Sequence, residues 1–328
     1  MLASPYASPG WLRNPHLQSV LASSPLRSAQ GHRRLQHIRA RHQPMLLDVG
    51  NGVRLQGIAS QPVDLAPRAQ VLLLHGWEGS AESSYMQLTA ARLLAAGMAV
   101  FRLNFRDHGD SHHLNTGLFH SNRLDEVVDA AGVVARLWPQ LPLLAAGFSL
   151  GGNFALRLAL RAPTAGLPLQ RVAAICPLLD PADAMTRMET GPALYLRYFE
   201  HKWRRSLARK RSLFPQAHTF GDDVLRLRMR ALTDWMVRNT TTFPDLATYF
   251  DGYSIAAGRL QGLSLPADIL MAEDDPVIPL DEFHRIANYP AVTLELARHG
   301  GHCGFIENAA LDGYAERWVA QRLQSALM

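Results

Sequence analysis

The sequence predicts an α/β domain with a mostly parallel central sheet and helices on both of its faces. Short continuous apolar runs alternate with amphipathic segments from about residue 45 to residue 176, and the strand pattern returns near the C-terminus. Such continuous apolar strands are typical of a parallel sheet that is covered on both sides. The chain has 328 residues, 48% of them hydrophobic, which is enough for one large core and excludes wholesale disorder.

Six strands are expected before residue 177, with a turn at Gly50-Asn51-Gly52 between the first two. Two more are expected near the C-terminus. The predicted strands are residues 45–49, 53–59, 71–74, 98–103, 141–147, 172–176, 267–271 and 292–296. Helices are predicted at residues 81–96, 124–137, 150–160 and 308–326.

Residues 181–262 interrupt this alternation, because their patterning is helical and contains no convincing strand. We therefore expect a helical cap of residues 181–262, inserted after the sixth strand of a core formed by residues 44–180 and 263–328. Residues 1–43 are rich in Pro, Ser and Arg and have no clear period. They predict a basic N-terminal arm of loops and short helices.

The net charge of +5 is unevenly distributed. Residues 1–41 contain six arginines and no acid, and residues 197–211 contain seven Lys or Arg against Glu200 alone. Each segment thus carries +6, so the remainder of the chain carries a net charge of −7. The sequence predicts an acidic body with two basic segments, which suit an anionic substrate or membrane surface.

The number of cysteines and the absence of long apolar runs bear on the expected location of the protein in the cell. Cys176 and Cys303 are too few for a disulfide scaffold or a zinc site built on thiolates, and they agree with a reducing environment. No apolar run approaches the ~18 residues of a membrane span, and Met1–Arg13 lacks a secretory pattern. We expect a cytoplasmic protein, with peripheral contact at the inner face of the membrane as a further expectation.

A candidate nucleophile lies in the run Gly147-Phe148-Ser149-Leu150-Gly151, between a predicted strand and a predicted helix. This is the context that the G-x-S-x-G pattern requires, because small residues flank a tight turn that lifts the serine hydroxyl above the strand ends. The alternative is a glycine-rich strand–helix turn with a capping serine. The position between two strongly periodic segments favours Ser149 as the nucleophile.

The run GFSLGGN (Gly147–Asn153) resembles the nucleophile elbow of α/β-hydrolases. Further motifs, in the same order, resemble the YheT-like branch of that superfamily, which includes bacterial predicted esterases and mammalian abhydrolase-domain phospholipases. These motifs are Asn14–Ser19 (NPHLQS), His75–Ser80 (HGWEGS), Asn104–Arg106 (NFR) and Tyr249–Asp251 (YFD). The resemblance spans roughly residues 11–310 and implies an α/β-hydrolase fold with esterase-type activity.

A serine nucleophile needs an imidazole base and a carboxylate that orients it, and in this fold the chain order is serine, acid, histidine. Residues 271–279 follow a predicted strand and read as the acid loop. The resemblance selects Asp275 over Asp274, and the alternative is a solvated acidic turn. It also selects His302, which precedes x-Gly-Phe after the last predicted strand, over His299.

Two backbone N–H groups should hold the oxyanion of the tetrahedral intermediate. The resemblance assigns them to Leu150, directly after the nucleophile, and to Trp77, in the loop after the strand at residues 71–74. The Trp77 side chain has either a pocket-wall role or a packing role. Such a mechanism needs no cofactor and no metal. The loop of residues 107–120 contains a cluster of acidic and histidine residues whose spacing matches no standard zinc motif: Asp107, His108, Asp110, His112, His113 and His120.

Residues 195–211 predict a basic helix with an aromatic stripe, because Tyr195, Phe199, Trp203 and Leu207 recur at every fourth position. Three interpretations stay open: packing of the aromatics on the core, contact with anionic lipid or acidic substrate, and contact with nucleic acid. The acidic body and the absence of a recognisable nucleic-acid module disfavour the third.

The predicted function is a serine hydrolase that cleaves carboxylic esters, lipid esters among them, through an acyl-enzyme. Amide, thioester and peptide substrates remain open, because the same three residues serve them. The alternative is a non-catalytic protein of the same fold that binds a membrane surface or a partner through its basic segments.

Overall fold

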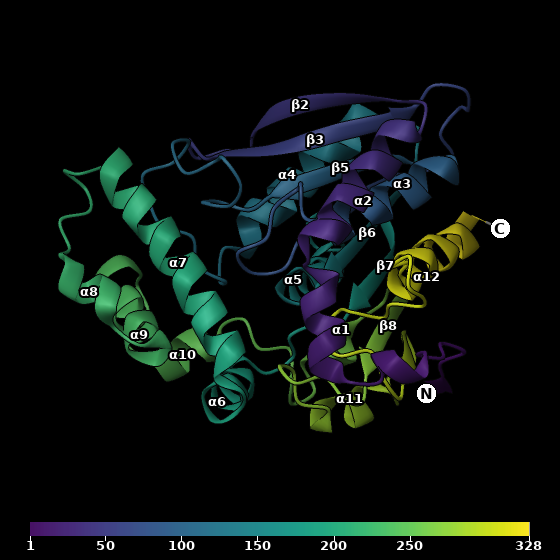
Figure 1. The fold of residues 1–328 in the computed structure, drawn as a ribbon. Coiled ribbons are helices and arrows are strands. Elements are labelled where there is room, and N and C mark those ends of the chain that lie inside the picture. The colour runs from purple at the N-terminus through teal and green to yellow at the C-terminus, as the bar shows by residue number, and fades with distance from the viewer. Residues whose placement is uncertain (328) are drawn as a thin grey trace.

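The computed structural model describes residues 1–327 and contains one nine-stranded sheet with helices packed around it (Figure 1). The strands are β1 (Leu2–Ala3), β2 (Ala40–Asp48), β3 (Arg54–Pro62), β4 (Gln70–Leu74), β5 (Ala99–Asn104), β6 (Leu143–Phe148), β7 (Leu169–Ile175), β8 (Ala267–Ala272) and β9 (Val292–Ala297). The α-helices are α1 (Pro15–Ala22), α2 (Pro25–His37), α3 (Ser84–Ala95), α4 (Leu124–Leu137), α5 (Leu150–Arg161), α6 (Pro181–Thr190), α7 (Ala193–Leu213), α8 (Asp222–Arg226), α9 (Met229–Thr240), α10 (Leu246–Asp251), α11 (Asp281–Ile286) and α12 (Tyr314–Gln324).

The strand order across the sheet is β1-β9-β8-β7-β6-β4-β5-β3-β2. Pairing is parallel from β1 to β5, and β3 and β2 are added antiparallel at one edge. Because parallel strands end at the same edge, the loops after β4, β6, β8 and β9 meet there. In open α/β sheets this edge is where ligands bind.

The predicted strands and core helices all occur, with ends that differ by a few residues. Helix α4 has the predicted bounds, whereas the predicted last helix is shorter and begins at Tyr314. The two-residue strand β1, which pairs with β9, was not predicted because so short a strand has no detectable period. The helical insertion therefore follows the seventh strand of the sheet and not the sixth.

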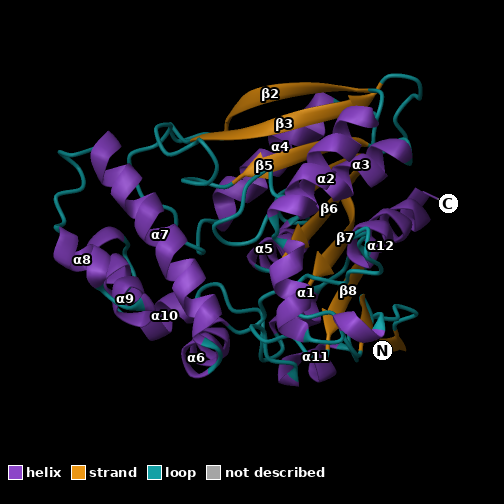
Figure 2. Ribbon diagram, viewed as in Figure 1, coloured by secondary structure: helices purple, strands orange, loops and turns teal. Residues whose placement is uncertain are grey.

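Helices cover both faces of the sheet, as predicted (Figure 2). Helices α2 and α3 pack against each other, and α12 packs on α3, while α4 and α5 form a second layer. The strands between them are fully buried: every residue of β4, β5, β6 and β8 is inaccessible to solvent or nearly so. This burial explains why those strands are continuous apolar runs rather than alternating ones.

Helices α6–α10 follow β7 and precede β8 in the sequence. They lie together at one side of the sheet (Figure 1). Residues 1–43 pack on the core through α1 and α2, with Leu12, Ala22 and Leu35 buried. Arg27 of α2 is also buried and forms an ion pair with Glu316 of α12. Within residues 1–327, none of the helices combines the length and the apolar character needed to cross a membrane.

Candidate active site

Ser149 lies in a sharp turn between β6, which ends at Phe148, and α5, which begins at Leu150. Its backbone has φ 53° and ψ −117°, a combination that non-glycine residues rarely adopt. The flanking glycines are required by space: a Cβ at Gly147 would collide with the carbonyl of Gly151, and one at Gly151 would collide with Leu74 O. The two glycines of the motif thus have a steric reason, and the turn presents the hydroxyl at the strand ends.

The structure brings Ser149, His302 and Asp275 together although 153 residues separate the first two. His302 Nε2 lies 3.0 Å from Ser149 Oγ, and His302 Nδ1 lies 2.8 Å from Asp275 Oδ2. A carboxylate only accepts, so Nδ1 carries a proton that it donates to Asp275. When the ring is neutral, Nε2 presents its lone pair to the serine. These are the contacts that a base and its orienting acid require.

Asp275 is held rigidly, which fixes the ring of His302 in turn. Its Oδ1 accepts the backbone N–H groups of Val277 (2.8 Å) and Ile278 (2.9 Å), and its side chain is 1% exposed. The side chain of His302 is 12% exposed. Burial lowers the pKa of His302, but the charge of Asp275, the charge interaction with Cys303 and the hydrogen bond to Asp275 outweigh burial and raise that pKa to about 9.

The two competing residues of the sequence analysis form a separate pair. His299 Nδ1 lies 3.3 Å from Asp274 Oδ2, and Asp274 Oδ1 accepts the backbone N–H of Gly301 at 2.8 Å. Asp274 thus supports the loop that carries His302. Of the two acid–histidine pairs, the one of Asp275 and His302 faces Ser149.

Two backbone N–H groups close to Ser149 have no partner in the protein among the described residues 1–327. Leu150 is the first residue of α5, so its N–H has no partner within the helix. In the chain as described here, residues 1–327, the N–H of Trp77 donates to no protein acceptor. Both residues line the same pocket as Ser149, and their role as oxyanion donors stays a prediction.

The pocket above Ser149 has a volume of about 100 Å³ that water-sized molecules can occupy, and it opens to solvent. Its walls come from the loops after β4 and β5 and from the helical insertion, and they are mostly apolar. Trp77 lines it, which favours the wall role, while its ring also packs on Phe199 and Trp203 of α7. His120 lines it as well, and burial first, with nearby arginines second, lowers the pKa of His120 to about 3, so that this ring is neutral.

The N-terminal motif supports the histidine loop, a role that sequence reasoning missed. Ser19 Oγ accepts the backbone N–H of His302 at 2.8 Å, and Gln18 Oε1 accepts that of Ile306 at 2.8 Å. Both residues lie in α1, which Asn14 caps by accepting from the N–H groups of residues 16 and 17. The motif NPHLQS is the sequence signal that could have indicated this role of Gln18 and Ser19, although it served above only as part of the resemblance to the YheT-like branch.

Potential metal ligands gather at one point. In the part of the chain that is described, residues 1–327, the only such group consists of Cys176, His302 and Cys303, whose donor atoms lie within 4.8 Å of one another. Cysteine spacing alone did not predict this proximity. Because both nitrogens of His302 already contact Asp275 and Ser149, we assign the group no metal.

Several acidic and histidine residues of the loop after β5 have separate partners instead of a common centre. Asp107 pairs with Lys210 at 2.6 Å, and His112 Nε2 lies 2.8 Å from Ser206 Oγ. His108 Nδ1 lies 2.7 Å from Arg106 O, so that this nitrogen carries the proton. The cluster therefore joins the core to helix α7.

The strand order, the parallel pairing and the surrounding helices define the class of protein by its fold, which is that of the α/β-hydrolases. The family and the relative named next place it among the esterases and hydrolases of this fold. The chain belongs to the family described as serine aminopeptidase, S33, whose model matches residues 66–309. It is 25% identical over 273 residues to the putative esterase YheT of Escherichia coli (strain K12), which covers 81% of this chain and 78% of that protein. The resemblance to the YheT-like branch is thereby confirmed.

Solved esterase structures share the fold. The Pyrobaculum calidifontis esterase superposes with a TM-score of 0.59 at 17% identity, covering 96% of this chain and 97% of the other. The Pyrococcus furiosus esterase Pf2001 superposes with a TM-score of 0.58 at 14% identity, covering 89% and 94%. At these identities the likeness establishes the fold alone.

Proposed function

We propose that the protein is a serine hydrolase that cleaves carboxylic esters through an acyl-enzyme. The observation that carries the proposal is the chain of contacts from Asp275 through His302 to Ser149 Oγ, at 2.8 and 3.0 Å, at the base of an apolar pocket. A serine hydroxyl is a weak nucleophile, and an imidazole within hydrogen-bonding distance activates it.

In the proposed mechanism, His302 Nε2 takes the proton of Ser149 as Oγ attacks the carbonyl carbon of the ester. The N–H groups of Trp77 and Leu150 hold the oxyanion, and Asp275 stabilises the imidazolium. His302 then gives the proton to the leaving alcohol, and an acyl-enzyme remains. Water, activated by the same histidine, releases the acid.

The lining of the pocket favours an ester over an N-terminal peptide substrate. Within residues 1–327, the lining of this pocket includes no Asp or Glu. A free α-ammonium group would therefore have no carboxylate partner there, and burying such a charge without a partner is costly. Apolar side chains from α6 and α9, among them Met185, Met188 and Met236, instead suit an aliphatic acyl chain. Lipid esters fit this class.

A fluorophosphonate probe tests the proposal, because it reacts with activated serines. The wild-type chain should be labelled, and Ser149→Ala should not be. Absence of labelling in a folded wild-type protein would exclude an activated serine. Turnover of p-nitrophenyl esters of increasing acyl length then measures the chain length that the pocket accepts.

We propose that the helices of residues 181–262 form a cap over this pocket. We also propose that α7 contacts a membrane surface as a secondary function. Most basic residues of α7 have protein partners, since Lys202, Arg204, Arg209, Lys210 and Arg211 each contact an oxygen of the chain. For exposed Arg197 and Arg205, the contacts described within residues 1–327 include no acceptor. Co-sedimentation with anionic vesicles should weaken in Arg197→Glu/Arg205→Glu, and unchanged binding would remove these arginines from the contact.

A further inference from the structure

Helix α7 is bonded directly to the loop that carries Trp77. Lys202 Nζ donates to the carbonyl oxygen of Glu78 at 2.9 Å, across 124 residues of sequence. Glu78 has φ 55°, so the chain turns sharply immediately after Trp77. Burial raises the pKa of the Glu78 carboxyl to about 8, against the effect of Lys202, so this carboxyl is mostly protonated at neutral pH. Lys202 therefore contacts the loop through a backbone oxygen and not through an ion pair.

The side chain of Trp77 is held by the same helix. Its ring stacks on Phe199 with a centroid distance of 5.3 Å and an interplanar angle of 15°, and it meets Trp203 edge-on at 5.4 Å. Such aromatic pairs prefer defined geometries. Lys202 lies between Phe199 and Trp203 in the sequence. About one turn of α7 therefore contacts both the Trp77 side chain and the backbone carbonyl of Glu78.

On the side of the core, Tyr85 holds the other end of this loop. Its hydroxyl accepts the N–H of Gly76 at 3.0 Å, and Gly79 N donates to Gly76 O at 3.0 Å to close the turn. A Cβ at Gly79 would lie 2.6 Å from the Tyr85 hydroxyl, so the loop packs closely on the core. The residue that lies between these two anchors is Trp77.

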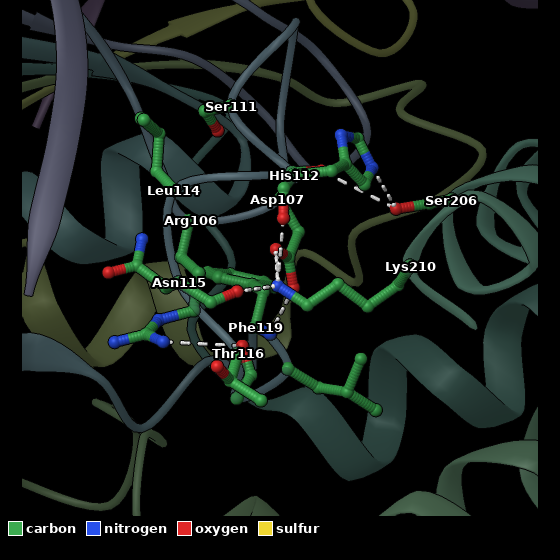
Figure 3. A network of polar contacts seen from close by, with 12 residues as sticks. Arg106, Asp107, Ser111, His112, Leu114, Asn115, Thr116, Phe119, Ser206 and Lys210 are labelled. Atoms are coloured by element: carbon green, nitrogen blue, oxygen red, sulfur yellow. Dashed lines mark hydrogen bonds and ion pairs between the residues drawn. The ribbon is translucent and has the colours of Figure 1, made fainter. Parts of the chain in front are cut away.

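Two helical turns further on, α7 is anchored to the core by a second lysine (Figure 3). Lys210 Nζ is buried and donates to Asp107 Oδ1 at 2.6 Å and to His112 O at 3.1 Å, and it also contacts Asn115 O. Asp107 Oδ2 in turn accepts the N–H of Phe119 at 2.8 Å. Eight residues separate the two lysines, or about 12 Å along the helix axis. The Lys210 anchor thus fixes where Lys202 meets the loop.

We propose that Lys202 is a positioning residue for the oxyanion hole: by holding the Glu78 carbonyl, it aims the N–H of Trp77 at the substrate oxygen. This inference rests on the proposed function, and it adds that the helical insertion completes the catalytic site as well as covering it. The bonded carbonyl belongs to the peptide between Glu78 and Gly79, and the Trp77 N–H belongs to the peptide between Gly76 and Trp77, so the bond fixes the loop one residue after the donor. Its loss should therefore affect the oxyanion more than the binding of the substrate.

The test compares Lys202→Met, Lys202→Arg and the matched control Arg209→Met, an exposed basic residue of the same helix. Turnover of p-nitrophenyl butyrate gives kcat and KM, and a trifluoromethyl ketone that forms a hemiketal with the serine reports on the oxyanion hole. Removing an oxyanion donor altogether costs about 10²–10³ in kcat. For a misaimed donor we expect Lys202→Met to lower kcat about tenfold and to raise the inhibition constant of the ketone about tenfold, with KM within about twofold.

Lys202→Arg should restore both values to within about twofold, because a guanidinium also donates to a carbonyl. Arg209→Met should match the wild type. A Lys202→Met variant with wild-type kcat and ketone inhibition, or one in which only KM or the melting temperature changes, would overturn the positioning role. Fluorophosphonate labelling of the wild type distinguishes a failure of this inference from a failure of the proposed function. If the wild type is labelled and Lys202→Met behaves like the control, this inference fails alone, whereas an unlabelled wild type means that the proposed function fails.

Discussion

Ser19 Oγ accepts the backbone N–H of His302 at 2.8 Å, so a helix near the N-terminus holds the loop of the candidate base near the C-terminus. Ser19 also donates to Pro15 O at 2.7 Å, which orients its hydroxyl. A Cβ at Gly301 would collide with the same Pro15 oxygen. Helix α1 and the histidine loop are therefore packed as closely as their backbones allow, and the motif NPHLQS has a structural role at the site.

Replacing Ser19 should consequently reduce catalysis through His302. Ser19→Ala leaves the N–H of His302 without its acceptor, and a lost hydrogen bond of this kind costs about 1 kcal/mol. We expect kcat for a p-nitrophenyl ester to fall about five- to tenfold, with partial recovery in Ser19→Thr. Ser23→Ala, at an exposed serine just after the same helix, is the control. Equal kcat in Ser19→Ala and Ser23→Ala would contradict a role for this bond.

The two neighbouring aspartates should differ sharply in their effect. Asp275 holds the Nδ1 proton of His302, and an amide in its place can stabilise the wrong tautomer, so Asp275→Asn should lower kcat by about 10⁴. Asp274 bonds to His299 and to the N–H of Gly301, so Asp274→Asn should cost no more than about tenfold. Steady-state kinetics on both variants decides the assignment, and the reverse order of effects would transfer the role to Asp274.

His302→Ala and His299→Ala extend this comparison to the base. The first removes the group that faces Ser149 Oγ at 3.0 Å and should lower turnover by about 10⁴ or more. Within residues 1–327, the hydrogen bonds described for the His299 ring reach Asp274 alone, so its removal should leave turnover within about tenfold. Comparable activity in the two variants would show that neither serves as the base alone.

The pH dependence of activity follows from the raised pKa of His302, which is about 9. The base must be neutral to accept a proton, so kcat/KM should rise with pH through about 9 and be about a hundredfold lower at pH 7 than on the plateau. The same shift predicts that the His302–Asp275 pair contributes fully to stability below pH 6.5, and that this contribution is lost as pH rises through about 9. A profile of kcat/KM between pH 6 and 10, with Ser149→Ala as the blank for spontaneous hydrolysis, measures the midpoint. A flat profile between pH 7 and 10 would contradict the shift.

Sequence reasoning predicted what depends on local pattern and missed what depends on distant contacts. The elbow at Ser149 was predictable because its glycines, strand and helix are consecutive, and β4 to β9 were predictable because buried parallel strands are apolar runs. By contrast, the bond from Ser19 to His302 spans 283 residues, and that from Lys202 to Glu78 spans 124. No period or spacing encodes such pairs. The sequence likewise held no sign of the protein partners of α7, where five of the seven basic side chains contact oxygens of the chain, among them the buried Lys210.

That buried lysine gives the last prediction, which concerns stability. Lys210 and Asp107 have side chains 1% and 6% exposed and form an ion pair at 2.6 Å. Burial lowers the pKa of Lys210 and raises that of Asp107, and each partner opposes the shift of the other. Removing one member of such a pair leaves a charge buried without a partner, which costs about 3–5 kcal/mol. Lys210→Met should therefore lower the free energy of unfolding in urea by about that amount.

The same helix offers a matched exposed pair as the control. Arg209 and Asp110 have side chains 44% and 87% exposed and lie 3.2 Å apart, so Arg209→Met should cost less than about 1 kcal/mol. Adding Asp107→Asn to Lys210→Met removes the unpaired charge, and the double variant should lose less than the sum of the two single losses. If Lys210→Met unfolds at the same urea concentration as Arg209→Met, the buried pair does not anchor α7, and the attachment of this helix to the core must come from its aromatic contacts instead.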